Sequence, residues 1–308
     1  MNSTSNRPEA SAPARGPGAK RALVIRIGAL GDVLLTRRLT YSLRLSGFHS
    51  TLFAPARHAT LLLADPWIDG VLDSEGPAHA AALSGSWPES AGRFEVAIVI
   101  SNSNDLIEAA KGAAGTLIRI PPAPVREDAL ISTQWSEAAA ALAAPFAGLL
   151  PRLMTRAQEA TFAGATLIHP GSGSPRKNWP VERFVDLSRK IESLGHRVVW
   201  IRGPAEMGQP EVWTGERIDR PSLQGLAATL AASRLFIGND SGVSHLAGAV
   251  GAATVTLFGP TRGEVWRPDG ARVRVVDSPN GTMGGLTLEA VLAEAKASLH
   301  EGQEGGSK

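Results

Sequence analysis

The residues that could do chemistry stand in short polar blocks, each of which follows a run of apolar residues. The first block, residues 28–32 (Gly-Ala-Leu-Gly-Asp), places the carboxylate of Asp32 after the apolar run 22–27. The two glycines allow a tight turn and the close approach of a ligand, and an Asp at a helix start can simply cap free N–H groups. A dinucleotide fingerprint would need glycine where Arg26 stands, so this block alone does not indicate nicotinamide or flavin binding.

The second block is typical of an anion site. Residues 169–173 (His-Pro-Gly-Ser-Gly) expose backbone N–H groups, and Arg176 and Lys177 follow just before an expected helix. Backbone donors and cations at a helix start suit a phosphate group. The Gly-Lys-Ser/Thr ending of a P-loop is missing, so triphosphate hydrolysis is not implied, and an ordinary basic loop is the alternative.

The third block, residues 238–245 (Gly-Asn-Asp-Ser-Gly-Val-Ser-His), lies between an apolar run and a helix of small residues. Its hydroxyl and amide donors suit a diphosphate. A hydrolase triad of Asp240, Ser241 and His245 is not favoured, because the chain has no Gly-x-Ser-x-Gly elbow. The seven histidines show no metal-ligand spacing and there is no cysteine, so we expect no resident metal.

Strands that alternate with helices must position these blocks. Strands are expected near residues 22–27, 51–53, 71–72, 96–100, 166–168, 198–201, 235–237 and 254–258, with helices near 33–46, 59–64, 136–144, 181–194, 222–232, 243–250 and 286–299. The pattern predicts two α/β units with parallel sheets, joined near residues 150–160. Ligands bind beyond the carboxyl ends of such strands, where all three blocks stand, so two facing domains would bring the blocks to one cleft.

Composition agrees with a two-domain protein of the cytoplasm. The chain has 308 residues, 43% of them hydrophobic, and no apolar run is long enough to span a membrane. Residues 1–19 are expected to be a disordered tail. Residues 1–50 carry eight basic side chains against two acidic ones, so peripheral contact with the inner membrane surface is a second interpretation of this end. Basic and aromatic residues are not interleaved, so nucleic acid is not an expected partner.

Taken together, the blocks resemble glycosyltransferase family 9, the ADP-heptose:lipopolysaccharide heptosyltransferases. The resemblance spans about residues 21–300 and is carried, in order, by residues 26–36, 169–180, 203–206, 238–247 and 257–261. It implies a GT-B architecture, in which two Rossmann-like domains with parallel sheets face each other across a cleft. The expected parts are an acceptor-side domain (20–150), a nucleotide-sugar-binding domain (160–285) and a closing helix (286–300) that packs back on the first domain.

The resemblance also implies roles for individual residues. Asp32 would be the general base, and Arg37 and Arg38, which replace the common Thr-Pro stretch, would contact the acceptor. The implied donor site consists of Ser172, Lys177, Glu206, Asp240, Ser241, Gly242 and His245. Residues 101–104 (Ser-Asn-Ser-Asn) replace a Gln-Gly motif, so the acceptor half departs further from the family than the donor half.

The function implied is inverting transfer of a sugar to a lipopolysaccharide-core or related glycan acceptor. Heptose from ADP-heptose is the expected sugar and donor. Its partners would be the nucleotide sugar and a glycolipid or glycan. No cofactor is required, since Lys177 and a helix terminus can neutralise the diphosphate, although bound Mg²⁺ is compatible with the site. A non-catalytic sugar-nucleotide-binding protein of the same fold and a nicotinamide-dependent oxidoreductase are the alternatives.

Overall fold

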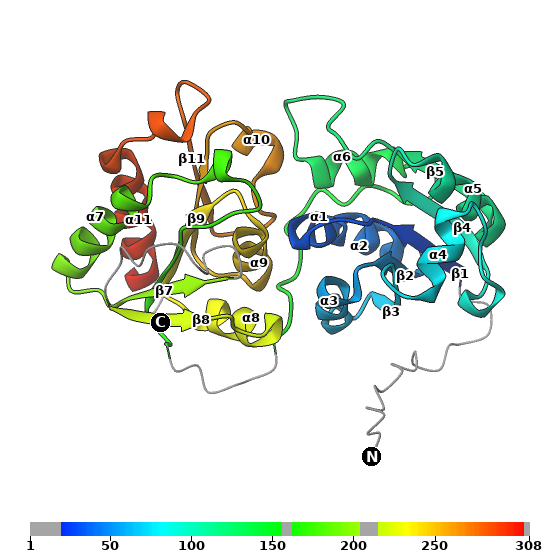
Figure 1. Cartoon of the computed structure of the whole chain (residues 1–308), viewed down its shortest axis with the longest axis horizontal. Coiled ribbons are helices and arrows are strands. Elements are labelled where there is room, and N and C mark those ends of the chain that lie inside the picture. The colour runs from blue at the N-terminus through cyan, green and yellow to red at the C-terminus, as the bar shows by residue number, and fades with distance from the viewer. Residues whose placement is uncertain (1–19, 156–161, 204–214, 305–308) are drawn as a thin grey trace, which may run out of the picture.

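The computed structural model describes residues 20–155, 162–203 and 215–304; the expected tail, residues 1–19, lies outside them. The described strands form one five-stranded and one six-stranded sheet, and every strand pairing is parallel. Figure 1 shows the two α/β lobes side by side. The expected two-domain α/β architecture is therefore confirmed.

The first sheet has the strand order β3-β2-β1-β4-β5. Its strands are β1 (Lys20–Ile25), β2 (Phe48–Ala54), β3 (Ile68–Asp73), β4 (Phe94–Ile100) and β5 (Ala114–Ile120). Its helices are α1 (Leu30–Leu35), α2 (Arg37–Leu45), α3 (Ala56–Ala59), α4 (Pro77–Leu83), α5 (Asn104–Ala113) and α6 (Ile131–Ala138). Ala22 and Val24 share one core with α1 and α2, while Leu23 and Ile25 share another with α4 and α5. Both faces of β1 are covered, which explains its uninterrupted apolar run.

The second sheet has the order β8-β7-β6-β9-β10-β11. Its strands are β6 (Thr166–His169), β7 (Val198–Arg202), β8 (Glu216–Asp219), β9 (Leu235–Asn239), β10 (Thr254–Phe258) and β11 (Val273–Asp277). Its helices are α7 (Val181–Ser193), α8 (Leu223–Ala232), α9 (Gly242–Val250), α10 (Gly263–Trp266) and α11 (Leu288–Glu304). The order reverses between β6 and β9, as it does between β1 and β4 in the first sheet. Loops at such reversals form the ligand crevice of doubly wound sheets.

The closing helix differs from expectation. α11 contacts α7 and strands β9, β10 and β11, so it packs on its own domain and not back on the first one. Val291, Ala295 and Leu299 recur every four residues and share a core with Ile168 and Ile237 of the second sheet. The apolar stripe of α11 is therefore buried against the second sheet.

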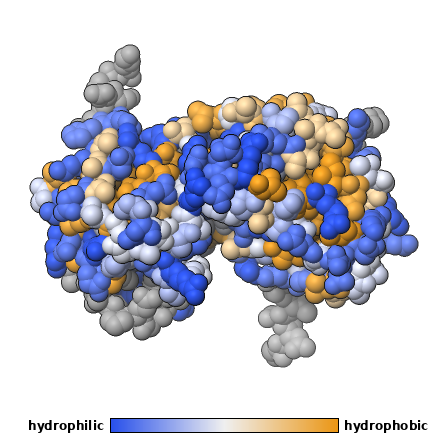
Figure 2. All heavy atoms as spheres, turned by 90° about the horizontal axis from the view of Figure 1, so that it is seen from above, coloured by the Kyte–Doolittle hydropathy of each residue, from blue (hydrophilic) through white to orange (hydrophobic). Residues whose placement is uncertain are grey.

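The two domains meet through α1 and α9, whose residues belong to one continuous apolar core. In Figure 2, hydrophilic residues gather where the lobes meet on the upper side. None of the described helices combines the length and apolarity that a membrane crossing requires.

Candidate active site

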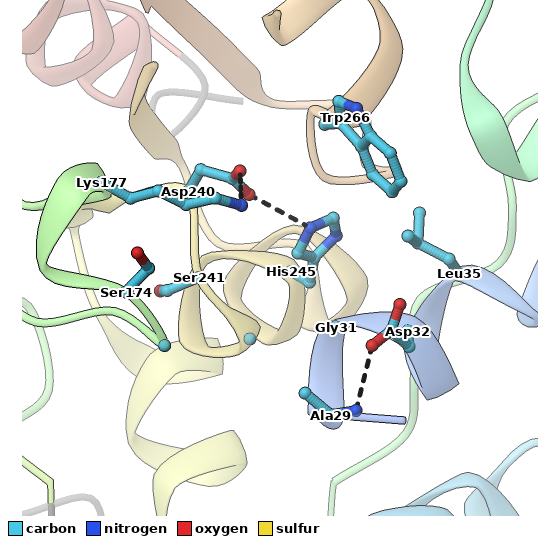
Figure 3. Close-up of a pocket in the computed structure, with 12 residues that line it drawn as sticks. Ala29, Gly31, Asp32, Leu35, Ser174, Lys177, Asp240, Ser241, His245 and Trp266 are labelled. Carbon is cyan, nitrogen blue, oxygen red and sulfur yellow. Dashed lines mark hydrogen bonds and ion pairs between the residues drawn. The ribbon is translucent and has the colours of Figure 1, made fainter. Parts of the chain in front are cut away.

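A cleft of about 260 Å³ lies between the lobes. Figure 3 shows that α1 of the first domain forms one wall, while the loops after β6 and β9, together with α10, form the other. The lining residues are Ala29, Gly31, Asp32, Leu35, Gly173, Ser174, Lys177, Asp240, Ser241, Gly242, His245 and Trp266. The three polar blocks of the sequence therefore meet at one place.

Asp32 stands on the first wall, with its side chain 28% exposed. One carboxylate oxygen forms an ion pair with Arg26, and the other accepts a hydrogen bond from the Ala29 N–H at 3.0 Å. The second bond caps α1, so the capping role foreseen for Asp32 is present. Gly28 is required here, because a methyl group in its place would lie 2.8 Å from the Asp32 Cβ. Each carboxylate oxygen has two lone pairs, so Asp32 retains acceptor capacity toward the cleft.

Asp240 is the centre of the second wall and is only 7% exposed. One oxygen accepts hydrogen bonds from Lys177 Nζ at 2.6 Å and from the Thr261 hydroxyl at 2.8 Å. The other lies 3.9 Å from His245 Nε2. Burial alone would raise the pKa of the Asp240 carboxyl, but the interactions with His245 and Lys177 outweigh burial and lower its pKa to about 2. Asp240 is thus ionised at every physiological pH.

α9 directs its amino terminus into the cleft. The Ser241 side chain caps this helix by accepting a hydrogen bond from the Ser244 N–H at 3.4 Å. A helix start leaves its first backbone N–H groups available and carries partial positive charge. An anion in the cleft would meet this terminus and Lys177 together.

Asn239 joins the two loops of the second wall. Its side chain accepts a hydrogen bond from the Trp179 N–H at 3.1 Å and donates one to the Pro170 carbonyl at 2.6 Å. The residue is fully buried at the end of β9, so it fixes the β6 loop against the β9 loop. Sequence analysis did not give it this role. A polar residue that ends an apolar strand beside Asp240 was the available signal.

Two predicted donor residues need separate comment. Ser172 does not line the cleft; its hydroxyl bonds to the Ser174 carbonyl at 2.8 Å and to Asn178 at 2.6 Å, within its own loop. Glu206 lies outside the described residues. The donor roles of Ser172 and Glu206 stay predictions.

Arg37 and Arg38, the predicted acceptor contacts, are 2% and 5% exposed and do not line the cleft. Arg37 forms a two-bond ion pair with Asp65, and Arg38 forms one with Asp269. Both guanidinium groups are thus engaged by carboxylates, and the acceptor roles of Arg37 and Arg38 stay predictions. The burial of Arg37 and Arg38, together with the ion pair of Arg26 with Asp32, also removes three of the eight basic groups that favoured a positively charged amino-terminal surface.

Two further residues of the site were missed by sequence analysis. Trp266 comes from α10 and stands above the cleft in Figure 3, where its ring can cover a planar or sugar group. Arg26, besides pairing with Asp32, lies 5.2 Å from the ring centre of Trp135. The signal for Arg26 was a cation at the end of a buried strand, six residues before an Asp.

Within the described ranges, no group of three or more His, Asp or Glu side chains is arranged to hold a metal ion. The described cleft brings the Asp32 carboxylate on one wall opposite the Asp240 carboxylate, Lys177, a hydroxyl and helix N–H groups on the other.

Comparisons with known proteins match the sequence of this chain to a family. The family model for glycosyltransferase family 9 (heptosyltransferase) matches residues 137–291, half of the chain. Lipopolysaccharide heptosyltransferase 1 of Escherichia coli O18:K1:H7 is 28% identical over 121 residues, and the match spans 37% of this chain and 37% of that relative.

Solved structures share the fold over nearly the whole chain. A family 9 glycosyl transferase from Veillonella parvula superposes with a TM-score of 0.76 at 20% identity, covering 94% of this chain and 99% of that one. The E. coli ADP-heptose lps heptosyltransferase II gives 0.72 at 19% identity, with 92% and 99% covered.

Proposed function

Because the chain belongs to glycosyltransferase family 9, we propose that it is an inverting glycosyltransferase that moves a sugar from a nucleotide donor to a glycan. Heptose from ADP-heptose is the proposed donor, and lipopolysaccharide core or a related glycan is the proposed acceptor. One observation carries this proposal. Asp32 on one domain faces Lys177, Asp240, Ser241 and His245 on the other, across a single cleft.

The two walls supply the two halves of such a reaction. An acceptor hydroxyl gives its proton to Asp32, and its oxygen attacks the anomeric carbon of the donor. The bond from that carbon to the phosphate oxygen breaks, and its electron pair leaves with the nucleoside diphosphate. Lys177 and the start of α9 stabilise the charge that develops on this leaving group.

Asp240 serves a different purpose. A buried carboxylate would repel a diphosphate, but its oxygens are good acceptors for sugar hydroxyls, and its ion pair holds Lys177 in the cleft. We therefore assign Asp240 to the donor sugar and Lys177 to the diphosphate. We propose that the enzyme acts in the cytoplasm, with contact to the inner membrane surface where the acceptor is a glycolipid.

The test measures binding and transfer separately. Calorimetry of the full chain with ADP, ADP-heptose, UDP-sugars and NAD identifies the donor, and mass spectrometry of a heptose-deficient lipopolysaccharide extract incubated with the protein and ADP-heptose identifies transfer. We expect binding of the ADP compounds, a product heavier by one heptosyl group, and inverted anomeric configuration by NMR.

The alternatives give other results. A non-catalytic binding protein would bind ADP-heptose without modifying any acceptor. A nicotinamide-dependent oxidoreductase would bind NAD in preference to ADP-heptose, and that outcome would end the glycosyltransferase proposal.

A further inference from the structure

A buried ion pair joins the two domains outside the cleft. Arg38 of α2 donates through Nε and Nη2 to both carboxylate oxygens of Asp269, at 2.8 and 2.7 Å. Asp269 belongs to the second domain, in the loop between α10 and β11. The side chains are 6% and 12% exposed, so water screens this pair little.

The first domain contributes two further contacts. The Ser132 hydroxyl of α6 donates to Asp269 at 3.1 Å. Arg38 also donates through Nη1 to the Phe146 and Gly148 carbonyls, at 2.7 and 3.0 Å, on the segment that leads into the second domain. Arg38 thus holds both the second domain and the connector that reaches it.

On the first domain, the pair is coupled directly to the cleft. α2 begins at Arg37, and only Thr36 separates it from α1, the helix that carries Asp32. A displacement of Arg38 and α2 is therefore expected to displace α1, which forms the first wall of the cleft.

On the second domain the coupling is equally short. The loop that carries Asp269 packs directly against α9. The contact is so close that a methyl group on Gly248 of α9 would lie 2.8 Å from the Pro268 Cβ. α9 carries His245, and the same loop follows Trp266 of the cleft. A gap of only about 10 Å³, bordered by Leu35, His245 and Asp269, separates the ion pair from the cleft. The ion pair and the cleft are therefore separated by closely packed residues in the described structure.

A second ion pair between the domains, Arg262 with Glu127, has side chains 56% and 68% exposed. Such a pair contributes little to a fixed geometry. The buried pair is the one suited to fix how the domains are placed.

We propose that Arg38 and Asp269 are positioning residues, which set the separation of Asp32 from the donor-side wall and so control the turnover step. This inference rests on the proposed function for its kinetic consequence. The residues on the donor-side wall, Lys177, Asp240 and Ser241, all belong to the second domain, so nucleotide affinity should depend on the pair far less than turnover does. Transfer needs both walls, and a shift of about 1 Å in a reacting group can cost about 100-fold in rate.

The chain offers a matched control next to Arg38. Arg37 and Asp65 form an equally bidentate ion pair, with bonds of 2.6 and 2.8 Å and side chains 2% and 1% exposed. Both residues belong to the first domain, and the bond from Arg37 to the Pro151 carbonyl of the connector, at 2.9 Å, does not involve Asp65. Asp65→Asn and Asp269→Asn therefore make the same chemical change. The first weakens an ion pair within one domain, and the second weakens an ion pair between the two domains.

The experiment combines kinetics with a distance measurement. The chain has no cysteine, so spin labels at Leu45→Cys and Leu194→Cys, both exposed and one on each domain, report the interdomain distance by electron–electron double resonance. For Asp269→Asn we expect a broader or longer distance distribution, kcat lower by about 10- to 100-fold and ADP affinity within twofold. For Asp65→Asn we expect a lower melting temperature with an unchanged distance and kcat.

Other outcomes are decisive as well. An unchanged distance distribution and a kcat within twofold in Asp269→Asn would overturn the proposal. If that variant does not fold, Ser132→Ala removes one bond to Asp269 and should move the same readouts in the same direction by less; no change there also overturns it. If Asp269→Asn widens the distance distribution but the parent protein transfers no sugar, the proposed function is refuted and the positioning role stands.

Discussion

Gly31 and Gly242 lie against each other where the domains meet, one on α1 and the other at the start of α9. A methyl group on Gly31 would lie 3.6 Å from the Gly242 Cα, and one on Gly242 would lie 3.2 Å from the Gly31 nitrogen. The two helix starts can approach this closely because neither residue has a side chain. Asp32 follows the first glycine directly and His245 stands three residues after the second, so this contact brings the two walls of the cleft together.

Gly242→Ala should therefore disturb the cleft. Its methyl group would lie 2.9 Å from the Leu30 Cβ, and α1 and α9 must separate to accept it. We expect stability to fall by about 1–3 kcal/mol and turnover to fall by about 10- to 100-fold. Gly115→Ala is the control, since its nearest neighbour would be 3.9 Å away. Equal kcat values for the two variants would show that the close contact does not matter.

The central strands could be predicted from sequence, and three edge strands could not. β1, β4, β6, β7, β9 and β10 are buried over nearly all their length and read as continuous apolar runs. β5, β8 and β11 stand at sheet edges with mostly exposed or half-buried residues, so their sequences carry no such run. These strands form because they pair with a neighbouring strand, and the local sequence does not indicate that pairing.

The site shows the same division. The block around Asp240 was recognisable because its glycines and donors follow one buried strand. The partners of Arg38 were not, since Asp269 is 231 positions away and nothing local marks it. The residue type of two adjacent arginines suggests surface cations, and only the fold shows that each forms an ion pair with a distant carboxylate.

Lys177→Ala should weaken donor binding. The change removes a charge-assisted contact to the diphosphate worth about 1.5–3 kcal/mol, which corresponds to about 10- to 100-fold in the dissociation constant of ADP. It also leaves Asp240 without its closest cation, and that carboxylate then repels the diphosphate. Lys177→Arg should recover only part of the affinity, because a planar guanidinium fills the space differently. Calorimetry with ADP measures both variants.

The neighbouring exposed Arg176 provides the control for Lys177. Arg176→Ala removes the same charge from the same loop without reaching Asp240 in any contact of the described structure. Its ADP affinity should stay within about threefold of the parent. If Arg176→Ala and Lys177→Ala lose equal ADP affinity, the effect of Lys177 comes from the overall charge of the loop and not from a specific contact.

Asp240 makes stability depend on acid pH. Its pKa is lowered from 3.8 to about 2 in the folded protein, so its ionised form contributes stability above pH 3.8, and this contribution is lost as the pH falls toward 2. The full contribution is about 2 kcal/mol, of which about 1 kcal/mol disappears between pH 5 and pH 3. Urea unfolding of the parent and of Asp240→Asn at both pH values measures it. A stability difference between the two proteins that stays constant over this range would contradict the assignment.

Asp32→Asn separates the capping role of this residue from the catalytic one. Asn can still accept the hydrogen bond from the Ala29 N–H, so the cap of α1 survives, while the ion pair with Arg26 becomes a neutral contact. Because that pair is partly exposed, we expect the melting temperature to fall by only a few degrees. Asn cannot take the proton of the acceptor hydroxyl, so turnover should fall by about 10²- to 10⁴-fold.

ADP affinity should hardly change in Asp32→Asn, because the donor-side wall is built from the second domain. Asp105, in the first turn of α5, supplies the control. Asp105→Asn makes the same change at a helix start outside the cleft, and it should leave both turnover and ADP affinity at the parent values. Turnover is measured on the glycan extract, with melting temperature and ADP affinity taken on the same samples. If Asp32→Asn keeps activity within a few-fold of the parent, Asp32 is only a cap, and the base must be sought elsewhere on the first wall.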